Sequence, residues 1–112
     1  MAIILWSYNV THTIQTYKTM TKVIFRKFKN GEIIALFPQE PATRNGWECM
    51  SYMHVGQHGS ADPNIVHRTK PAKWGEFVEL LRELQSIGYD DLKICKKFTQ
   101  EDYKVRKERA RL

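Results

Sequence analysis

The sequence predicts a small α+β domain: an antiparallel sheet of order β-β-β-α-β, one amphipathic helix packed on one face, and a basic C-terminal tail helix. Three observations predict this class. Runs of β-branched and aromatic residues flank an Asn-Gly pair, one later segment has apolar residues at helical spacing, and 112 residues suit a single core.

The chain divides into three parts on composition. Residues 1–19 carry one charged side chain and predict either an N-terminal extension upstream of a start at Met20 or an extra edge strand. Residues 20–98 are expected to form the single α+β domain, and residues 99–112 a basic helical tail.

Residues 23–28 and 32–37 predict the first two strands, joined through Asn30-Gly31. A two-residue type I′ turn there would pair Phe28 with Ile33. This register brings four apolar residues to one face, which we expect to be the core face: Ile24, Phe28, Ile33 and Phe37.

Residues 47–55 predict a third strand in which Cys49 and Met53 face one way and Tyr52 and His54 the other. Residues 56–69, with two glycines, a proline and no hydrophobic period, are expected to form a polar loop.

Residues 71–88 predict the main helix, capped by Thr69 and ended by Gly88 in the left-handed region. Its apolar stripe is expected to be core: Trp74, Phe77, Val78, Leu81 and Leu84. Residues 92–98 predict a fourth strand with Leu92, Ile94 and Phe98 inward. Thr99 then resembles a helix cap, but the tail helix has few apolar residues to bury and is expected to fray.

The charge and cysteine content limit the function classes. Eighteen Lys and Arg against twelve Asp and Glu give a formal net charge of +6, which permits an anionic partner without identifying one. Two cysteines and the absence of a signal-peptide pattern or a long apolar run favour a reduced, cytoplasmic protein with no membrane partner.

One pattern resembles a known group of proteins. Tyr52, His54 and the Gly56-Gln57-His58 run form a Tyr-x-His-x-Gly-Gln-His segment, and a Thr-Lys-Pro-Ala helix start follows at residues 69–72. Together with residues 79–94, these motifs are similar to small bacteriophage and prophage proteins over about residues 20–98. The resemblance implies a mobile-element origin and a bacterial cytoplasm, and it implies no mechanism.

The densest polar group follows the third strand and is the candidate ligand or partner site: His54, Gln57, His58, Ser60 and Asp62. Glycine N–H groups with these side chains could hold an anion, although a turn-rich loop bonded to its own backbone would show the same pattern. A zinc site would need His54, His58, His67 and Cys49, whose spacing matches no standard pattern, so we expect no metal and no cofactor.

Catalysis is weakly indicated. Cys49 or Ser51 could pair with His54 as nucleophile and base, but nothing in the sequence orients the base. The carboxylates Glu79 and Glu83 are expected to lie on a solvated helix face.

The alternative to a protein-binding site is a nucleic-acid site. If the fourth strand lies beside the first, several cations could align with exposed Phe25, Trp47 or Tyr52 as a stacking platform. The cations of this hypothesis are Arg26, Lys27, Lys93, Lys96, Lys97, Arg106 and Lys107. In the opposing interpretation, the rings belong to the core and the lysines protect an edge strand against aggregation.

The leading hypothesis is therefore a small, non-enzymatic accessory protein of phage type. It would bind a host protein or an anionic ligand through residues 54–62 and the adjacent basic strands. Nucleic-acid binding is the first alternative, and a metal protein or enzyme using His54 and His58 the second. A homodimer is a further expectation, because small sheets have open edges.

Overall fold

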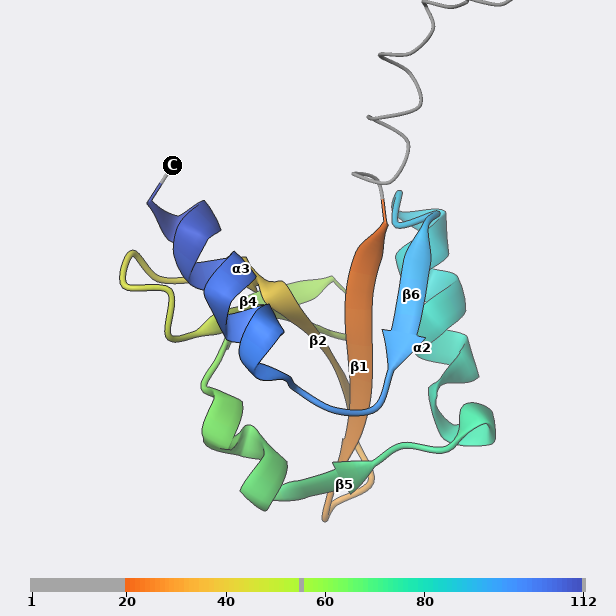
Figure 1. Ribbon diagram of the computed structural model, residues 1–112. Helices are drawn as coiled ribbons and strands as arrows, with labels where there is room; N and C mark the ends of the chain where they lie inside the picture. The colour runs from red at the N-terminus through yellow and green to blue at the C-terminus, as the bar shows by residue number, and fades with distance from the viewer. Residues whose placement is uncertain (1–19, 55, 112) are drawn as a thin grey trace, which may run out of the picture.

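The computed structural model describes residues 20–54 and 56–111, and these form one sheet with helices on both faces (Figure 1). The expected α+β class is confirmed. The strands are β1 Thr21–Phe28, β2 Ile33–Pro41, β3 Cys49–Met53, β4 Gln57–Ala61, β5 Thr69–Pro71 and β6 Leu92–Cys95. The helices are the 3₁₀-helix η2 Pro63–His67, α2 Trp74–Ser86 and α3 Gln100–Ala110. The predictions for residues 1–19 and for Val55 lie outside the described residues.

The sheet runs in the order β4-β3-β2-β1, and both β5 and β6 pair with the outer side of β1. β5 lies antiparallel to the end of β1, opposite Arg26 to Phe28, whereas β6 lies parallel to its beginning, opposite Thr21 to Ile24. The strand after the main helix therefore does lie beside the first strand. β5 ends at Pro71, opposite Arg26, and β6 ends at Cys95, opposite Ile24, so the carboxyl ends of the two strands meet beside Phe25. The segments that follow the two strands leave this point in different directions.

The prediction that residues 56–69 form an irregular polar loop is wrong. This segment contains β4, η2 and the start of β5. Residues 57–60 of β4 are exposed, so the strand has no apolar period that the sequence could reveal. Its backbone pairing with β3, from Cys49↔Ala61 to Met53↔Gln57, holds it in the sheet instead.

The predicted hairpin exists, but its turn is one residue longer than expected. The Gly31 N–H donates to the Phe28 carbonyl, the Phe28 N–H donates to the Glu32 carbonyl, and Gly31 has φ of 94°. This is the geometry of a three-residue turn that ends in a left-handed glycine. The register consequently pairs Phe25 with Ala35 and Lys27 with Ile33.

The one-residue shift separates the four residues that were expected to share a face, because neighbouring residues of a strand point to opposite sides. Ile24 and Phe28 pack on one side of the sheet, and Ile33 and Phe37 pack on the other. Both faces of the hairpin are buried, so the prediction of a single core face made of these four residues is wrong.

The core consequently has two layers. Against α2 lie Val23, Phe25, Ala35, Phe37, Tyr52, Phe77, Leu80, Leu81 and Leu84. On the opposite face, beneath η2 and α3, lie Ile24, Ile34, Leu36, Cys49, Ala61 and Ile65. The predicted alternation of the third strand is confirmed, since Cys49 and Met53 pack on the second layer and Met50 and Tyr52 on the first.

The main helix is shorter than predicted, and its stripe is not wholly core. Lys73 is the N-cap residue of α2, whereas Thr69 belongs to β5 and does not cap the helix. Trp74, at the first position of the helix, is 60% exposed. Gly88 follows the helix with φ of 119°, as expected.

The tail helix is anchored through polar contacts, which corrects the expectation that it would fray. Asp102 and Arg106 of α3 are 1% and 2% exposed. Arg106 donates to the carbonyls of Gly46 (2.7 Å) and Pro38 (2.6 Å), and Lys22 donates to Asp102 (2.6 Å). The Thr99 capping box is present as predicted.

Candidate functional site

The candidate site predicted at residues 54–62 is the β3–β4 hairpin, and its five side chains do not converge. Because β4 is extended, Gln57 points to one face of the sheet and His58 to the other. The His58 ring lies 4.7 Å from the Tyr52 ring across the strand pair, and the Tyr89 hydroxyl is 3.4 Å from His58 Nε2. Asp62 lies beyond the hairpin, where its carboxylate accepts from the Asn64 N–H as the cap of η2 and from Trp47 Nε1.

Glu83 of α2 organises this hairpin, which corrects the expectation that it belongs to a solvated helix face. Its carboxylate accepts hydrogen bonds from the Tyr52 hydroxyl, from His54 Nδ1 (2.5 Å) and, at 3.4 Å, from the Gly56 N–H. The hydrogen bond to Glu83, and secondarily burial, raises the pKa of Tyr52 above its ordinary value of 10.0. The contacts of His54 and Tyr52 therefore join the turn to the helix.

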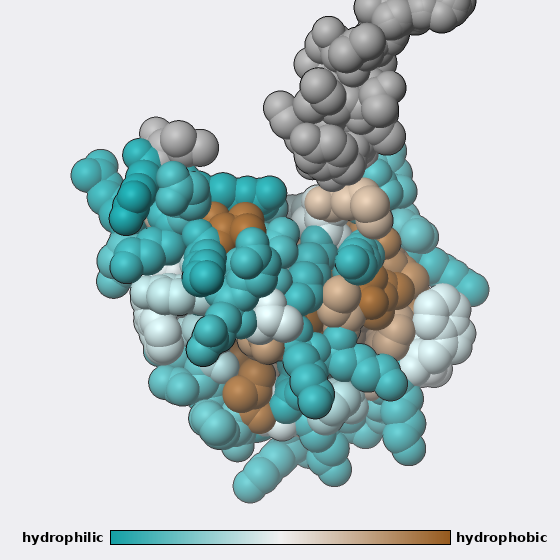
Figure 2. Space-filling view, in the orientation of Figure 1, coloured by the Kyte–Doolittle hydropathy of each residue, from teal (hydrophilic) through white to brown (hydrophobic). Residues whose placement is uncertain are grey.

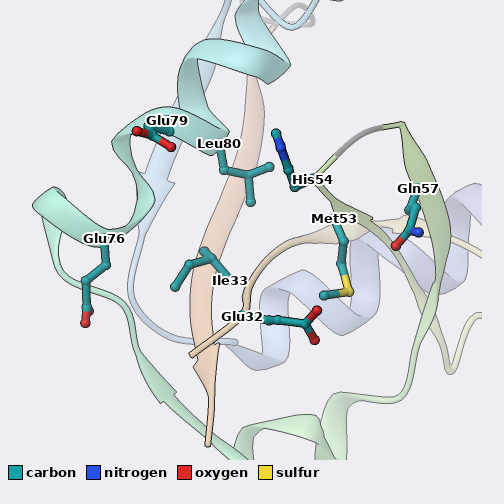
Figure 3. Close-up of a pocket in the computed structure, with 8 residues that line it drawn as sticks. All are labelled: Glu32, Ile33, Met53, His54, Gln57, Glu76, Glu79 and Leu80. Atoms are coloured by element: carbon teal, nitrogen blue, oxygen red, sulfur yellow. The ribbon is translucent and has the colours of Figure 1, made fainter. Parts of the chain in front are cut away.

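A pocket of about 370 Å³ lies beside this hairpin and receives two of the predicted site residues, His54 and Gln57 (Figure 3). Three glutamates stand around it: Glu32 from the β1–β2 turn and Glu76 and Glu79 from α2. An anion in this pocket would face three carboxylates, so the electrostatics of this pocket disfavour an anionic ligand. A second pocket of about 380 Å³ at the hairpin is lined by Gln57, His58, Ser60 and Asp62 together with Arg68.

The candidate nucleophiles are buried in the sheet. Cys49 is fully buried, and burial raises the pKa of its thiol to about 11. Ser51 is also buried, and its hydroxyl faces Gly59 of β4. A protonated, enclosed thiol and an enclosed hydroxyl are poorly placed to attack a substrate.

The histidines expected for the zinc alternative are not assembled with other ligands. In residues 20–54 and 56–111, no cluster of three or more His, Cys, Asp or Glu side chains has a geometry that could hold a metal ion. His54 lies against Glu83, His58 against Tyr89, and His67 lies apart at the end of η2.

The cations of the nucleic-acid alternative fall into two groups. Three serve the fold: Arg26 donates to Thr69 and Val66, Lys27 pairs with Glu76 at 2.5 Å, and Arg106 is buried. Four are exposed: Lys93 on β6, Lys96 and Lys97 just after it, and Lys107 on α3.

The rings that were expected to form a stacking platform are mostly unavailable. Phe25 and Tyr52 are buried in the layer against α2. Trp47 is partly exposed, but its indole N–H donates to Asp62 and its ring meets Tyr103 edge-on.

A different site, which was not predicted from the sequence, lies where β5 and β6 approach each other on β1. We call it the lysine groove. Its volume is about 710 Å³, and its wall consists of Phe25, Pro71, Ala72, Trp74, Phe77, Ile94 and Cys95, with Lys70, Lys73 and Lys96 around it. In Figure 2 a hydrophobic, brown surface lies over the β6 side of the molecule with hydrophilic, teal side chains beside it.

The wall of the lysine groove is apolar, and two of its large side chains are exposed. Trp74 is the most exposed large apolar side chain among the described residues, and Ile94, expected to face inward, is 43% exposed. The Trp74 ring meets Phe77 edge-on at 5.4 Å, and Phe77 stacks on Phe25 at 4.3 Å. Three rings from α2 and β1 thus lead from the surface to the core.

The cations of the lysine groove form no close ion pair with the described residues, although the Glu76 carboxylate accepts the Lys73 backbone N–H at 2.8 Å and lies within reach of the charge of its ammonium group. None of Lys70, Lys73 and Lys96 has a carboxylate oxygen of residues 20–54 or 56–111 within 4.0 Å of its ammonium group. An anionic partner therefore does not have to break an ion pair with a described carboxylate.

Comparison with protein-family models, with curated proteins and with solved structures gave no match for this chain. None of the helices described is long and apolar enough to cross a membrane.

Proposed function

We propose that this protein is a non-enzymatic binding protein that engages an acidic protein partner through the lysine groove. The observation that carries the proposal is the combination of an apolar wall, in which Trp74 and Ile94 are exposed, with three surrounding lysines that form no ion pair within 4.0 Å with a described carboxylate. Exposed Trp side chains in apolar recesses are typical anchors of protein interfaces, and surrounding charges select the partner and steer its approach.

The other sites support a binding role over catalysis. Cys49 and Ser51 are enclosed in the sheet, so neither candidate nucleophile is placed to attack a substrate with His54 as its base. One pocket at the predicted hairpin site is lined by three glutamates, which supports placing the contact with an anionic partner at the opposite edge of the sheet. The resemblance to small phage proteins supports a bacterial host protein as the source of the partner.

The test is capture of partners from a bacterial lysate, with and without nuclease, by the full chain and two charge variants. The groove variant carries Lys70→Glu, Lys73→Glu and Lys96→Glu. The control variant carries Lys29→Glu, Arg44→Glu and Lys104→Glu, which are equally exposed but lie elsewhere. Each triple lowers the formal net charge from +6 to zero, so only the position of the charges differs.

We expect the wild type and the control variant to retain the same acidic protein after nuclease treatment, and the groove variant to lose it. Equal capture by the groove variant would refute the site. Capture that disappears with nuclease would instead assign the lysines to nucleic-acid binding, whose phosphate contacts also give a steep salt dependence.

A further inference from the structure

Resting on the proposed function, we propose that the partner presents an extended acidic segment. This segment adds as a new strand to the outer edge of β6 and places an apolar side chain in the lysine groove.

The edge of β6 offers main-chain groups for such a strand. In the described part of the chain, β6 pairs with β1 alone. The Thr21 N–H donates to the Asp91 carbonyl at 2.9 Å, so the main-chain N–H and C=O groups of Asp91 face β1. Since alternate residues of a strand direct their N–H and C=O groups to the same side, those of Lys93 face β1, and those of Leu92 and Ile94 face away from it.

The position of the lysine groove matches that of an added strand. Ile94 and Cys95 of β6 form one wall of the groove, and Trp74 and Phe77 of α2 form another. A strand paired with β6 would turn every second side chain toward the α2 face. An apolar side chain at such a position would enter the groove and cover the exposed surfaces of Trp74 and Ile94.

The charges favour acidic residues on either side of that apolar anchor. Lys70 and Lys73 stand on the β5 and α2 side of the groove, and Lys96 stands where the chain leaves β6. A segment that crosses the groove therefore has ammonium groups on both sides of it. Carboxylates at those places would gain charge-assisted contacts at a partly enclosed surface.

A protein segment fits this site better than a nucleic-acid strand does. The groove wall presents apolar side chains apart from Cys95, and the lysines around it can donate to an inserted base but cannot accept from its amino groups. The outward N–H and C=O groups of β6 match the spacing of a peptide backbone, to which a phosphodiester chain has no counterpart.

The test uses a library of random linear peptides selected against the full-length wild-type protein. We expect the selected peptides to share an apolar residue flanked by Asp or Glu, and to lose binding to the Lys70→Glu, Lys73→Glu, Lys96→Glu variant. Selection of peptides without acidic residues, or of none, would overturn the inference, as would selected peptides that bind this variant unchanged. A single-stranded oligothymidylate that competes with the peptides for the site would favour the nucleic-acid alternative and equally overturn it.

A matched pair of substitutions tests the strand addition itself. Ile94→Ala shortens the side chain but keeps the outward N–H, whereas Ile94→Pro removes that N–H at an edge position where proline is tolerated. We expect Ile94→Pro to bind the selected peptide about tenfold more weakly than Ile94→Ala, the loss of one strand hydrogen bond. Equal affinities would exclude pairing through this N–H.

Amide hydrogen exchange of the wild type, with and without the peptide, tests strand addition even if Ile94→Pro does not fold. The peptide should slow exchange at the Leu92 and Ile94 amides and leave Lys93, already bonded to β1, little changed. No added protection at Leu92 and Ile94 would overturn strand addition. If the groove variant still lost its lysate partner in that case, the proposed function would stand without this binding mode.

Discussion

At the residue scale, the largest difference between sequence and structure concerns charged side chains. Asp102 and Arg106 lie in a segment so rich in charge that solvation is the natural expectation, yet both are almost fully buried. Charge counting could not predict this, because the carbonyls that Arg106 binds, at Gly46 and Pro38, are more than fifty positions away in the chain. The Thr99 cap was predictable because its partner is local.

The same residues predict an acid-sensitive tail helix. Burial alone would raise the pKa of Asp102, but hydrogen bonds from Lys22, the Thr99 N–H and Gln39 outweigh it and hold the pKa below the ordinary value of 3.8. A lowered pKa stabilises the fold above the unfolded-state value, and this stabilisation is lost as pH falls through the folded-state pKa.

We therefore expect Asp102→Asn to lower the free energy of unfolding by about 2 kcal/mol at neutral pH, because Lys22 loses its anionic partner. The difference from wild type should shrink as pH falls below 3.8, the ordinary pKa of the side chain, and approach zero once Asp102 is protonated. Urea unfolding at a series of pH values measures it. A difference that stays constant with pH would show that the charge is unimportant.

At the element scale, the β1–β2 hairpin shows that local sequence patterns predict the presence of a hairpin but not the length of its turn. Two strand-like runs around Asn30-Gly31 predicted the hairpin correctly, and the left-handed glycine is present. The length of the turn was wrong, because Asn-Gly suits both a two-residue turn and the last two positions of a three-residue turn. The sequence alone did not choose between them, since both faces of the hairpin are apolar and each register buries one.

Two Gly→Ala substitutions separate the two backbone environments. At both Gly31 and Gly75 an added Cβ would meet no atom within 4 Å, but Gly31 has φ of 94° whereas Gly75 is helical. We expect Gly31→Ala to destabilise the fold by about 1 kcal/mol and Gly75→Ala to stabilise it by about 0.5 kcal/mol. Thermal unfolding of both variants checks the signs, and a loss of equal size in both would contradict the turn geometry.

The β3–β4 hairpin depends on a contact that only the fold creates. Glu83→Ala removes the acceptor of the buried Tyr52 hydroxyl and the partner of His54, at an expected cost of about 2 kcal/mol. Glu79→Ala, an exposed change on the same helix, should alter stability by less than about 0.5 kcal/mol. Amide exchange near Gly56 should also accelerate in the Glu83 variant alone, and unchanged exchange there would argue against the link.

At the scale of the whole molecule, the structure shows where the cations behind the formal net charge of +6 lie. Several cations form ion pairs within the fold, among them Lys22, Lys27 and Arg109, while Lys70, Lys73 and Lys96 stand around the apolar wall of the lysine groove. The sequence predicted that the strand after the main helix could lie beside the first. It could not predict the lysine groove, because Trp74 has the helical spacing of a core residue, yet in the fold it is 60% exposed.

The central claim is that partners bind at the lysine groove and not at the β3–β4 hairpin. The most direct measurement is amide hydrogen exchange of the full chain, free and with the protein partner that it captures. The account predicts added protection at Leu92, at Ile94 and at the start of α2, with the amides of residues 57–61 unchanged. Protection confined to residues 57–61, with β6 unaltered, would contradict it.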